Sequence, residues 1–212
     1  MTISLSDTGK RYNREWIFRG LSYEFAIGNA YAITGPNGSG KSTLLQVLAG
    51  AVAHSEGKIS WKNAAGIIDP DLVYKQLSIA APYLDLIEEM TALEFLQFHQ
   101  SFKPFLPGFS IDDMLERVGL QNALHKQIRF YSSGMKQRIK LIQAIFSDTA
   151  LLLLDEPCSN LDASGISMYQ ELMAAFSKNR LVIVSSNDPQ EYGFCQEKLS
   201  ILDWKPAPKK IR

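Results

Sequence analysis

The sequence predicts an α/β protein with a mostly parallel central sheet, an antiparallel β region at its N-terminus and an inserted α-helical subdomain. The apolar runs "LLLL" at 151–154 and "LVIV" at 181–184 are typical of parallel strands buried on both faces, and helical patterns alternate with them. Residues 84–146 have a helical character instead. Together these patterns favour a layered sheet with helices on both faces and a separate helical lobe.

The N-terminal third contains strand patterns broken by turn residues. Strands are expected within residues 2–34, around 3–5, 21–27 and 30–34. A glycine-rich loop then leads into a helix over 41–50, where Gly50 suits the C-terminal cap. Residues 57–61 and 75–82 are predicted to form further strands.

The remaining elements follow from helical and strand periodicity. Helices are predicted at 91–102, 111–120 and 132–146, the last with Met135, Ile139, Ile142 and Phe146 on one face. A strand at 150–154, a helix at 163–176, a strand at 181–186, a short helix near 189–194 and a strand at 198–204 then alternate. We expect one domain over 1–212: a β-rich core at 1–83 and 147–204, a helical subdomain at about 84–146, and a loose tail at 205–212.

Composition narrows the class of protein. Of the 212 residues, 46% are hydrophobic and 21% charged, as is ordinary for a globular domain. Lys plus Arg and Asp plus Glu both number 22, so the charge pattern expected of a nucleic-acid binder is absent and no nucleic-acid partner is predicted. No apolar run approaches the roughly 20 residues that cross a bilayer. The sequence begins without a signal-peptide pattern and has two cysteines, so we expect a cytoplasmic protein that reaches a membrane only through a partner.

The segment "GPNGSGKST" at 35–43 fits the phosphate-loop pattern between an apolar strand and an amphipathic helix. Glycines let the backbone curl so that its N–H groups face phosphate oxygens, and the helix N-terminus adds partial positive charge. Lys41 is expected at the β- and γ-phosphates, Ser42 at Mg²⁺ and Thr43 at the α-phosphate. The alternative is a plain glycine-rich turn. The predicted nucleotide-binding residues here are Gly35, Pro36, Asn37, Gly38, Ser39, Gly40, Lys41, Ser42 and Thr43.

The segment "LLLLDEP" at 151–157 is the second chemical element. Asp155 emerges from a buried strand, where a carboxylate can hold Mg²⁺ directly or through water. Glu156 follows it at a place suited to polarising an attacking water. The alternative, in which both acids merely open a loop, is weakened by the phosphate loop earlier in the chain.

Four segments in order resemble the ATP-binding subunit of an ABC transporter: "GPNGSGKSTLL", "YSSGMKQRIKL", "LLLLDEP" and "SNLD". The resemblance covers nearly the whole chain, and the ordered set is far more specific than any one member. It implies a P-loop NTPase fold, ATP and Mg²⁺ as cofactors, and an ATPase that pairs with a second ATP-binding subunit. It also implies an integral-membrane transporter subunit as partner.

Two of these segments imply roles across a dimer. "YSSGM" at 131–135 resembles the family signature, usually Leu-Ser-Gly-Gly-Gln, with Ser132 and Gly134 retained and departures at 131, 133 and 135. The resemblance implies that Ser132, Ser133 and Gly134 cap the ATP of the second subunit, while Asp162 of "SNLD" links the two sites. The alternatives are ordinary helix N-caps at Ser132 or Ser133 and at Asp162, and these are compatible with the dimer roles.

The aromatic residue expected to stack on adenine is Tyr12, from its match to the family pattern. Trp16 or Phe18 are alternatives, and a plain packing role for Tyr12 is a third possibility. Five phenylalanines of the helical region are candidates for a docking groove or, more simply, for packing within that lobe: Phe95, Phe98, Phe102, Phe105 and Phe109.

Two departures from the family bear on mechanism. A glutamine normally found before the helical lobe is missing: Pro82 and Tyr83 stand there, Gln76 comes too early, and Asp85 is a speculative replacement. Where the family usually has a histidine that contacts the γ-phosphate, this chain has Asn187. An amide still donates a hydrogen bond but cannot carry a proton, so slow hydrolysis led by Glu156 is expected. The alternative for Asn187 is a turn residue before Asp188 and Pro189.

The sequence therefore predicts a Mg-dependent ATPase that powers a membrane transporter from the inner face of the membrane, as a homodimer or heterodimer of ATP-binding subunits. The runner-up is an ATP-dependent dimerisation switch with weak hydrolysis that regulates a membrane complex. A soluble ABC-type ATPase acting on ribosomes or DNA fits less well, because the chain has one set of motifs and no basic stripe.

Overall fold

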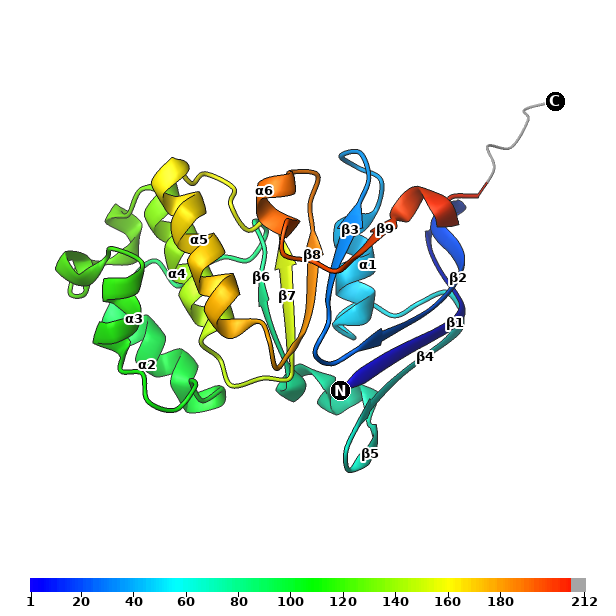
Figure 1. The fold of residues 1–212 in the computed structure, drawn as a ribbon, viewed down its shortest axis with the longest axis horizontal. Coiled ribbons are helices and arrows are strands. Elements are labelled where there is room, and N and C mark those ends of the chain that lie inside the picture. Colours follow the sequence, from blue (N-terminus) through cyan, green and yellow to red (C-terminus); the bar gives the residue numbers. More distant parts are fainter. Residues whose placement is uncertain (207–212) are drawn as a thin grey trace.

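The computed structural model describes residues 1–206, which form two sheets and a helical lobe (Figure 1). The predicted loose tail falls mainly on residues 207–212, which lie outside the described residues. The five-stranded sheet is in the middle of the molecule, the antiparallel sheet is on one side and the helical lobe is on the other.

The antiparallel sheet has the strand order β2-β1-β4-β5. Its first two strands form one long hairpin, so they extend well beyond the short strands predicted at 3–5 and 21–27. The three-residue strand β5 was not predicted. The four strands are β1 (Thr2–Tyr12), β2 (Glu15–Ala26), β4 (Glu56–Asn63) and β5 (Gly66–Ile68).

The central sheet has the order β6-β7-β8-β3-β9, and all its pairings are parallel, which confirms the predicted fold class. Its strands are β3 (Ala30–Thr34), β6 (Leu77–Ala80), β7 (Leu151–Asp155), β8 (Leu181–Ser185) and β9 (Glu197–Ser200). The strand predicted at 198–204 is wrong in its second half. Ser200 accepts the N–H of Leu202 through its hydroxyl and begins a 3-10 helix, Ile201–Trp204.

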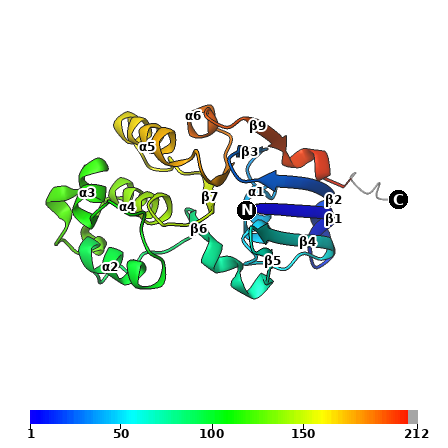
Figure 2. The same ribbon diagram turned by 60° about the horizontal axis from the view of Figure 1, so that its bottom comes forward.

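The two apolar strands β7 and β8 separate two hydrophobic cores. Because side chains alternate along a strand, Leu151 and Leu153 face one core, while Leu152 and Leu154 face the other. Helix α1 (Lys41–Leu48) fills the first core between the two sheets, as Figure 2 also shows. The second core lies beneath the helical lobe and α5 (Ala163–Phe176).

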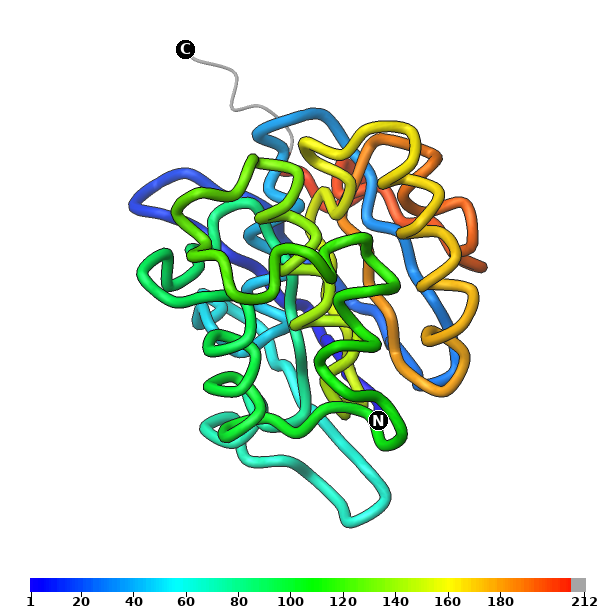
Figure 3. The backbone as a smooth tube through the Cα atoms, turned by 90° about the vertical axis from the view of Figure 1, so that its left-hand side faces the viewer, coloured from blue at the N-terminus to red at the C-terminus, as the bar shows by residue number. Residues whose placement is uncertain are grey.

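The lobe is built from three helices between β6 and β7 in the chain, and Figure 3 views it from its outer side. These are α2 (Ala92–Phe102), α3 (Ile111–Arg117) and α4 (Ser133–Ile145). Thr91 with Glu94 and Ser110 with Asp113 form capping boxes that fix the starts of α2 and α3. Two 3-10 helices lie in the connections of the lobe, η2 (Gln121–Ala123) and η3 (Ile128–Phe130), while η1 (Pro70–Gln76) precedes β6.

The lobe phenylalanines divide between packing and exposure. Phe95 and Phe105 are buried, and Phe109 packs edge-on against Phe146 of the core. Phe98 and Phe102 are 45% and 74% exposed and contact each other on the outer face of α2. Within residues 1–206, no helix has the length and apolar character required to cross a bilayer.

A buried arginine ties the lobe to the sheet. Arg180, just before β8, donates to the carbonyl of Ile145 at the end of α4 at 2.6 Å. It also donates to the hydroxyls of Ser78 on β6 and Thr149 before β7, at 2.9 and 2.5 Å. Three separate segments are therefore held by one guanidinium, whose fixed fork of donors suits several acceptors.

Candidate functional site

The glycine-rich loop 35–40 joins β3 to α1 at the carboxyl edge of the central sheet. Gly35, Gly38 and Gly40 all have positive φ, which side chains rarely adopt. A Cβ on Gly40 would lie 2.2 Å from Cγ2 of Ile17, and one on Gly35 would lie 2.6 Å from Cγ2 of Ile201. Backbone conformation and neighbouring side chains therefore both require glycine at the two ends of this loop.

The first turn of α1 offers several groups to an anion. Its N-cap, Gly40, provides no side-chain cap, and the turn holds no acidic residue, so its free N–H groups and partial positive charge remain available. Lys41 is 5% exposed, and its Nζ donates to the carbonyls of Gly35 and Pro36 at 2.7 and 3.4 Å. The buried hydroxyl of Ser39 has no hydrogen-bond partner in the part of the chain that the structure describes. This combination of donors fits a phosphate chain.

Asp155 ends β7 at the same carboxyl edge of the sheet and is 2% exposed. Its Oδ1 has no hydrogen-bond partner within residues 1–206, and the neighbouring strand places Ser185 opposite it. A buried, unpartnered carboxylate oxygen is costly unless a cation satisfies it. Oxygen donors are the ligands that Mg²⁺ prefers, so Asp155 and the half-buried Ser42 of α1 fit the predicted metal site.

Glu156 follows at once and has an unusual backbone, with φ of 43°. Its N–H donates to the carbonyl of Ser185 at 2.9 Å, and its carbonyl accepts the N–H and hydroxyl of Ser159 at 3.0 and 2.8 Å. Glu156 and Asn187 line one cavity of about 340 Å³. The two residues predicted to act on the terminal phosphate therefore line the same cavity.

Asn187, which follows β8, contacts the phosphate loop directly. Its Oδ1 accepts the N–H of Gly35 at 3.0 Å, and its Nδ2 donates to Oδ1 of Asn37 at 3.4 Å. The helix start that follows is capped by Asp188, which accepts the N–H of Gln190. The turn is thus formed by Asp188 and Pro189, while the Asn187 side chain lies on the loop predicted to hold phosphate.

The segment where the glutamine is missing brings a tyrosine close to the predicted metal site. Burial, together with the negative charge of nearby Asp155, raises the pKa of Tyr83, while hydrogen bonding to Gln46 opposes the rise. Asp85 is exposed, and its charge acts on Lys140 of α4. The speculative replacement by Asp85 has no support in this geometry, and Tyr83 is the side chain of this segment on which the charge of Asp155 acts.

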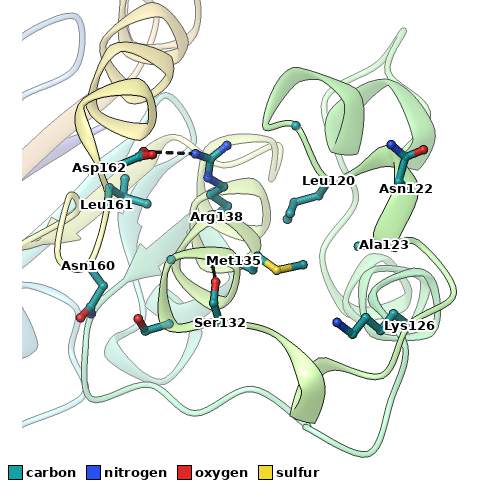
Figure 4. Close-up of a pocket in the computed structure, with 13 residues that line it drawn as sticks. Leu120, Asn122, Ala123, Lys126, Ser132, Met135, Arg138, Asn160, Leu161 and Asp162 are labelled. Carbon is teal, nitrogen blue, oxygen red and sulfur yellow. Dashed lines mark hydrogen bonds and ion pairs between the residues drawn. The ribbon is translucent and has the colours of Figure 1, made fainter.

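The signature-like segment begins α4 and lines a different cavity, of about 640 Å³ (Figure 4). Ser132 is the N-cap of this helix, and its hydroxyl accepts the N–H of Met135 at 3.2 Å. Ser133 and Gly134 lie in the first turn, which contains no acidic residue. The ordinary capping role is therefore present, and the uncapped remainder of the turn faces an open pocket.

Asp162 is on the wall of the same pocket and caps α5. Its Oδ1 accepts the N–H of Gly165 at 2.8 Å and the hydroxyl of Ser164 at 2.9 Å, and it pairs with Arg138 at 3.5 Å. The hydrogen bond from Gly165 is the main reason that the pKa of Asp162 is lowered. Sequence reasoning missed the two basic residues of this pocket, Lys126 and Arg138. Of the two, Arg138 could have been found more readily from the sequence, because it lies one helical turn after Gly134 of the signature-like segment.

The three aromatic candidates differ in exposure. Tyr12 is 46% exposed at the end of β1, with Nζ of Lys10 4.7 Å from its ring centre. Trp16 is half-buried near the start of β2. Phe18 is fully buried in the core around α1, so that alternative is wrong.

Two further residues contact the loop that carries Glu156, and sequence reasoning missed both. Gln137 of α4 donates to the carbonyl of Pro157 at 2.7 Å, and Glu191 of α6 (Pro189–Tyr192) accepts the N–H of Cys158 at 2.6 Å. Both side chains are almost fully buried, at 3% and 5% exposure. Their only signal in the sequence was a polar residue on an otherwise apolar helix face.

Comparison with known proteins places this geometry in a family. The family described as ABC transporter matches residues 18–159. The uncharacterized ABC transporter ATP-binding protein YybJ of Bacillus subtilis (strain 168) is 29% identical over 190 residues, which cover 89% of this chain and 86% of YybJ. The cytochrome c biogenesis ATP-binding export protein CcmA of Rhizobium meliloti (strain 1021) is 31% identical over 195 residues, covering 89% and 92% of the two chains.

The same fold occurs in a Pyrococcus furiosus protein described as an ABC transporter ATP-binding protein. Its structure aligns with a TM-score of 0.82 and 19% identity over 97% of this chain and all of that one. At this identity the structural match supports the fold, while the family match and the relatives support membership. This chain belongs to the ABC transporter family and is one of its ATP-binding proteins.

Proposed function

We propose that this chain binds and hydrolyses ATP with Mg²⁺ and powers a membrane transporter through ATP-driven pairing of two ATP-binding subunits. The observation that carries the proposal is the carboxylate oxygen of buried Asp155, which has no partner among residues 1–206 and lies at the same carboxyl edge of the sheet as the uncapped N-terminus of α1. Residues 1–83 and 147–204 would form the nucleotide-binding core, and 84–146 the helical subdomain that transmits movement.

In this proposal each residue of the core site has one task. The backbone of 35–40 and the Lys41 ammonium hold the phosphate chain, with Thr43 at its α-phosphate end. Ser42 and Asp155 hold Mg²⁺, which when bound neutralises charge on the phosphate oxygens. Glu156 orients a water molecule for attack, and the Asn187 amide donates a hydrogen bond to the terminal phosphate.

The second half of the site would come from another subunit. Ser132, Ser133 and Gly134 line one pocket, and Glu156 and Asn187 line another that shares only Leu161 with it, which supports the proposal that a second chain completes the site. A second subunit that supplies its own α4 N-terminus would add a hydroxyl and free N–H groups to the bound phosphate. Asp162, on the wall of the signature pocket, would connect the two sites.

The membrane partner is proposed from the relatives. CcmA is described as an ATP-binding export protein, and that description supports a role on the inner face of a membrane beside a membrane-embedded transporter subunit. The proposal covers both a homodimer and a heterodimer. Copurification with a different ATP-binding subunit would indicate a heterodimer, and its absence would indicate a homodimer.

A switch with weak hydrolysis is the second candidate, and Asn187 is the observation that favours it. Its amide is engaged with Gly35 and Asn37, and it cannot take the positive charge that an imidazole can. A switch would show a single round of phosphate release and little steady turnover, whereas a motor would show sustained turnover.

Phosphate release from purified protein with Mg-ATP tests the proposal. Replacing Glu156 by Gln keeps size and hydrogen bonding but removes the carboxylate, so turnover should fall by about 10²-fold or more while ATP binding is retained. Glu171→Gln, which alters an exposed carboxylate on α5 away from the cavity of Glu156, is the matched control. Turnover that is unaffected by Glu156→Gln would contradict the assignment of Glu156.

A further inference from the structure

The backbone at Glu156 adopts a conformation that needs support. Its φ of 43° lies in the left-handed region, which is unfavourable for a residue with a side chain. Local hydrogen bonds to Ser185 and Ser159 hold Glu156 itself. The next two residues leave a carbonyl, at Pro157, and an N–H, at Cys158, which face buried surroundings and require partners from elsewhere in the fold.

Glu191 satisfies the N–H of Cys158. Its Oε1 accepts the N–H of Cys158 at 2.6 Å, although α6 follows a different strand. The Glu191 backbone is fixed in turn, because the hydroxyl of fully buried Tyr169 donates to its carbonyl at 2.8 Å. Burial raises the pKa of Glu191, and hydrogen bonds from Ser186 and Cys158 oppose that rise.

Gln137, from a different helix, satisfies the carbonyl of Pro157. Its Nε2 donates to the carbonyl of Pro157 at 2.7 Å, and its side chain is 3% exposed. Gln137 lies on α4, about one helical turn after Ser132–Gly134. The loop that carries Glu156 is therefore joined both to the helix after Asn187 and to the helix that begins with the signature-like segment.

We propose that Glu191 and Gln137 are positioning residues for ATP hydrolysis, which hold the Glu156 loop between them so that its carboxylate faces the terminal phosphate. The inference rests on the proposed role of Glu156. It adds that the orientation of Glu156 depends on the position of α4. When the helical subdomain moves, Gln137 would shift the loop that carries Glu156 and so change where water is activated. Neither residue contacts the nucleotide in this account.

Four variants test the proposal. Glu191→Ala and Gln137→Met each remove one hydrogen bond to the loop. Glu191→Gln keeps an acceptor oxygen for Cys158. Gln170→Met is the matched control, because Gln170 donates to the carbonyl of Gln190 on the same short helix, at 3.1 Å, but is exposed and does not contact the Glu156 loop.

The measurements are steady-state phosphate release, the Kd for a fluorescent ATP analogue, and amide hydrogen exchange at Cys158 in nucleotide-free protein. Glu191→Ala and Gln137→Met should lower kcat by about 10- to 100-fold, with KM and Kd changed by less than about threefold. Glu191→Gln should retain kcat within about threefold of the native value, and Gln170→Met should match the native protein. Exchange at Cys158 should accelerate by about tenfold or more in Glu191→Ala alone.

An unchanged kcat in Glu191→Ala and Gln137→Met would overturn the proposal, as would an equal loss in Glu191→Gln and Glu191→Ala. A Glu191→Ala protein that does not fold would leave Gln137→Met and Glu191→Gln to decide. If Glu156→Gln itself leaves turnover unchanged, the proposed function fails, whereas exchange at Cys158 still reports whether Glu191 holds the loop.

Discussion

The asparagine at position 187 gives the sharpest prediction about rate. Its Nδ2 donates to Asn37 over 3.4 Å, a long hydrogen bond that a phosphate oxygen can replace at little cost. Asn187→Ala removes this donor and also the acceptor for the N–H of Gly35. Asn187→His supplies a side chain that can carry a positive charge beside the same loop.

The magnitude lies between two limits. A neutral hydrogen bond contributes about 0.5–1.5 kcal/mol net, and about 1.4 kcal/mol corresponds to tenfold in rate. A donor fully committed to a developing anion contributes roughly 2.7–4 kcal/mol, or about 10²–10³ in kcat. Because Asn187 is exposed and neutral, we expect Asn187→Ala to lower kcat by about 10- to 100-fold.

Asn187→His should raise kcat above the native value, and more so as pH falls toward the usual histidine pKa of about 6.5. The assay is steady-state phosphate release across pH 6–8, about the physiological range, with the Kd for ATP measured alongside. If Asn187→Ala retains kcat within about twofold of the native protein, Asn187 is a turn residue and the reasoning is refuted.

Three further predictions concern binding and stability. If Tyr12 stacks on adenine, Tyr12→Ala should raise the Kd for ATP by about 10-fold, whereas Trp16→Ala should leave it unchanged. The reverse result would identify Trp16 as the side chain that stacks on adenine. Burial lowers the pKa of His99 from 6.5 to about 4, so between these pH values the unfolded chain binds a proton that the folded one does not. The free energy of unfolding should therefore fall as pH drops through this window, and urea unfolding of His99→Gln should show a flatter profile. Arg180→Met removes the donor to three buried acceptors, so it should lower the free energy of unfolding in urea titrations by about 3 kcal/mol or more. A loss below about 1 kcal/mol would show that the three hydrogen bonds contribute little.

The parts of the fold predicted well from sequence are those that depend on local pattern. Continuous apolar runs identified β7 and β8 as doubly buried, and the glycine-lysine spacing of the phosphate loop predicted the strand and the helix that flank it. The strand end at 185–188 likewise predicted that Asn187 would reach the edge of the sheet, and its contact with Gly35 follows from parallel pairing of β3 and β8.

The features that the sequence did not predict depend on how deeply a side chain is buried and on hydrogen-bond partners that are distant in the sequence. Trp16 and Phe18 are two apart on β2, but the pairing with β1 shifts register between them, from Arg11 opposite Trp16 to Lys10 opposite Phe18, and one ring is half-buried while the other is fully buried. Gln137 and Glu191 are 20 and 33 residues from the backbone groups they satisfy. Nothing in the local pattern at either residue specifies such a partner.

The central claim is that bound ATP brings Ser132 of one subunit over the phosphate loop of another. Its most direct test is cross-linking from Ser132→Cys in the native membrane assembly, with and without a non-hydrolysable ATP analogue. The native cysteines, Cys158 and Cys195, are buried and half-buried and have pKa values raised by burial to about 12, so reaction at the introduced thiol is favoured. We predict a cross-link that appears only with the analogue and joins position 132 to the phosphate loop of a second ATP-binding chain. Cross-links confined to a single chain, or independent of nucleotide, would contradict the account.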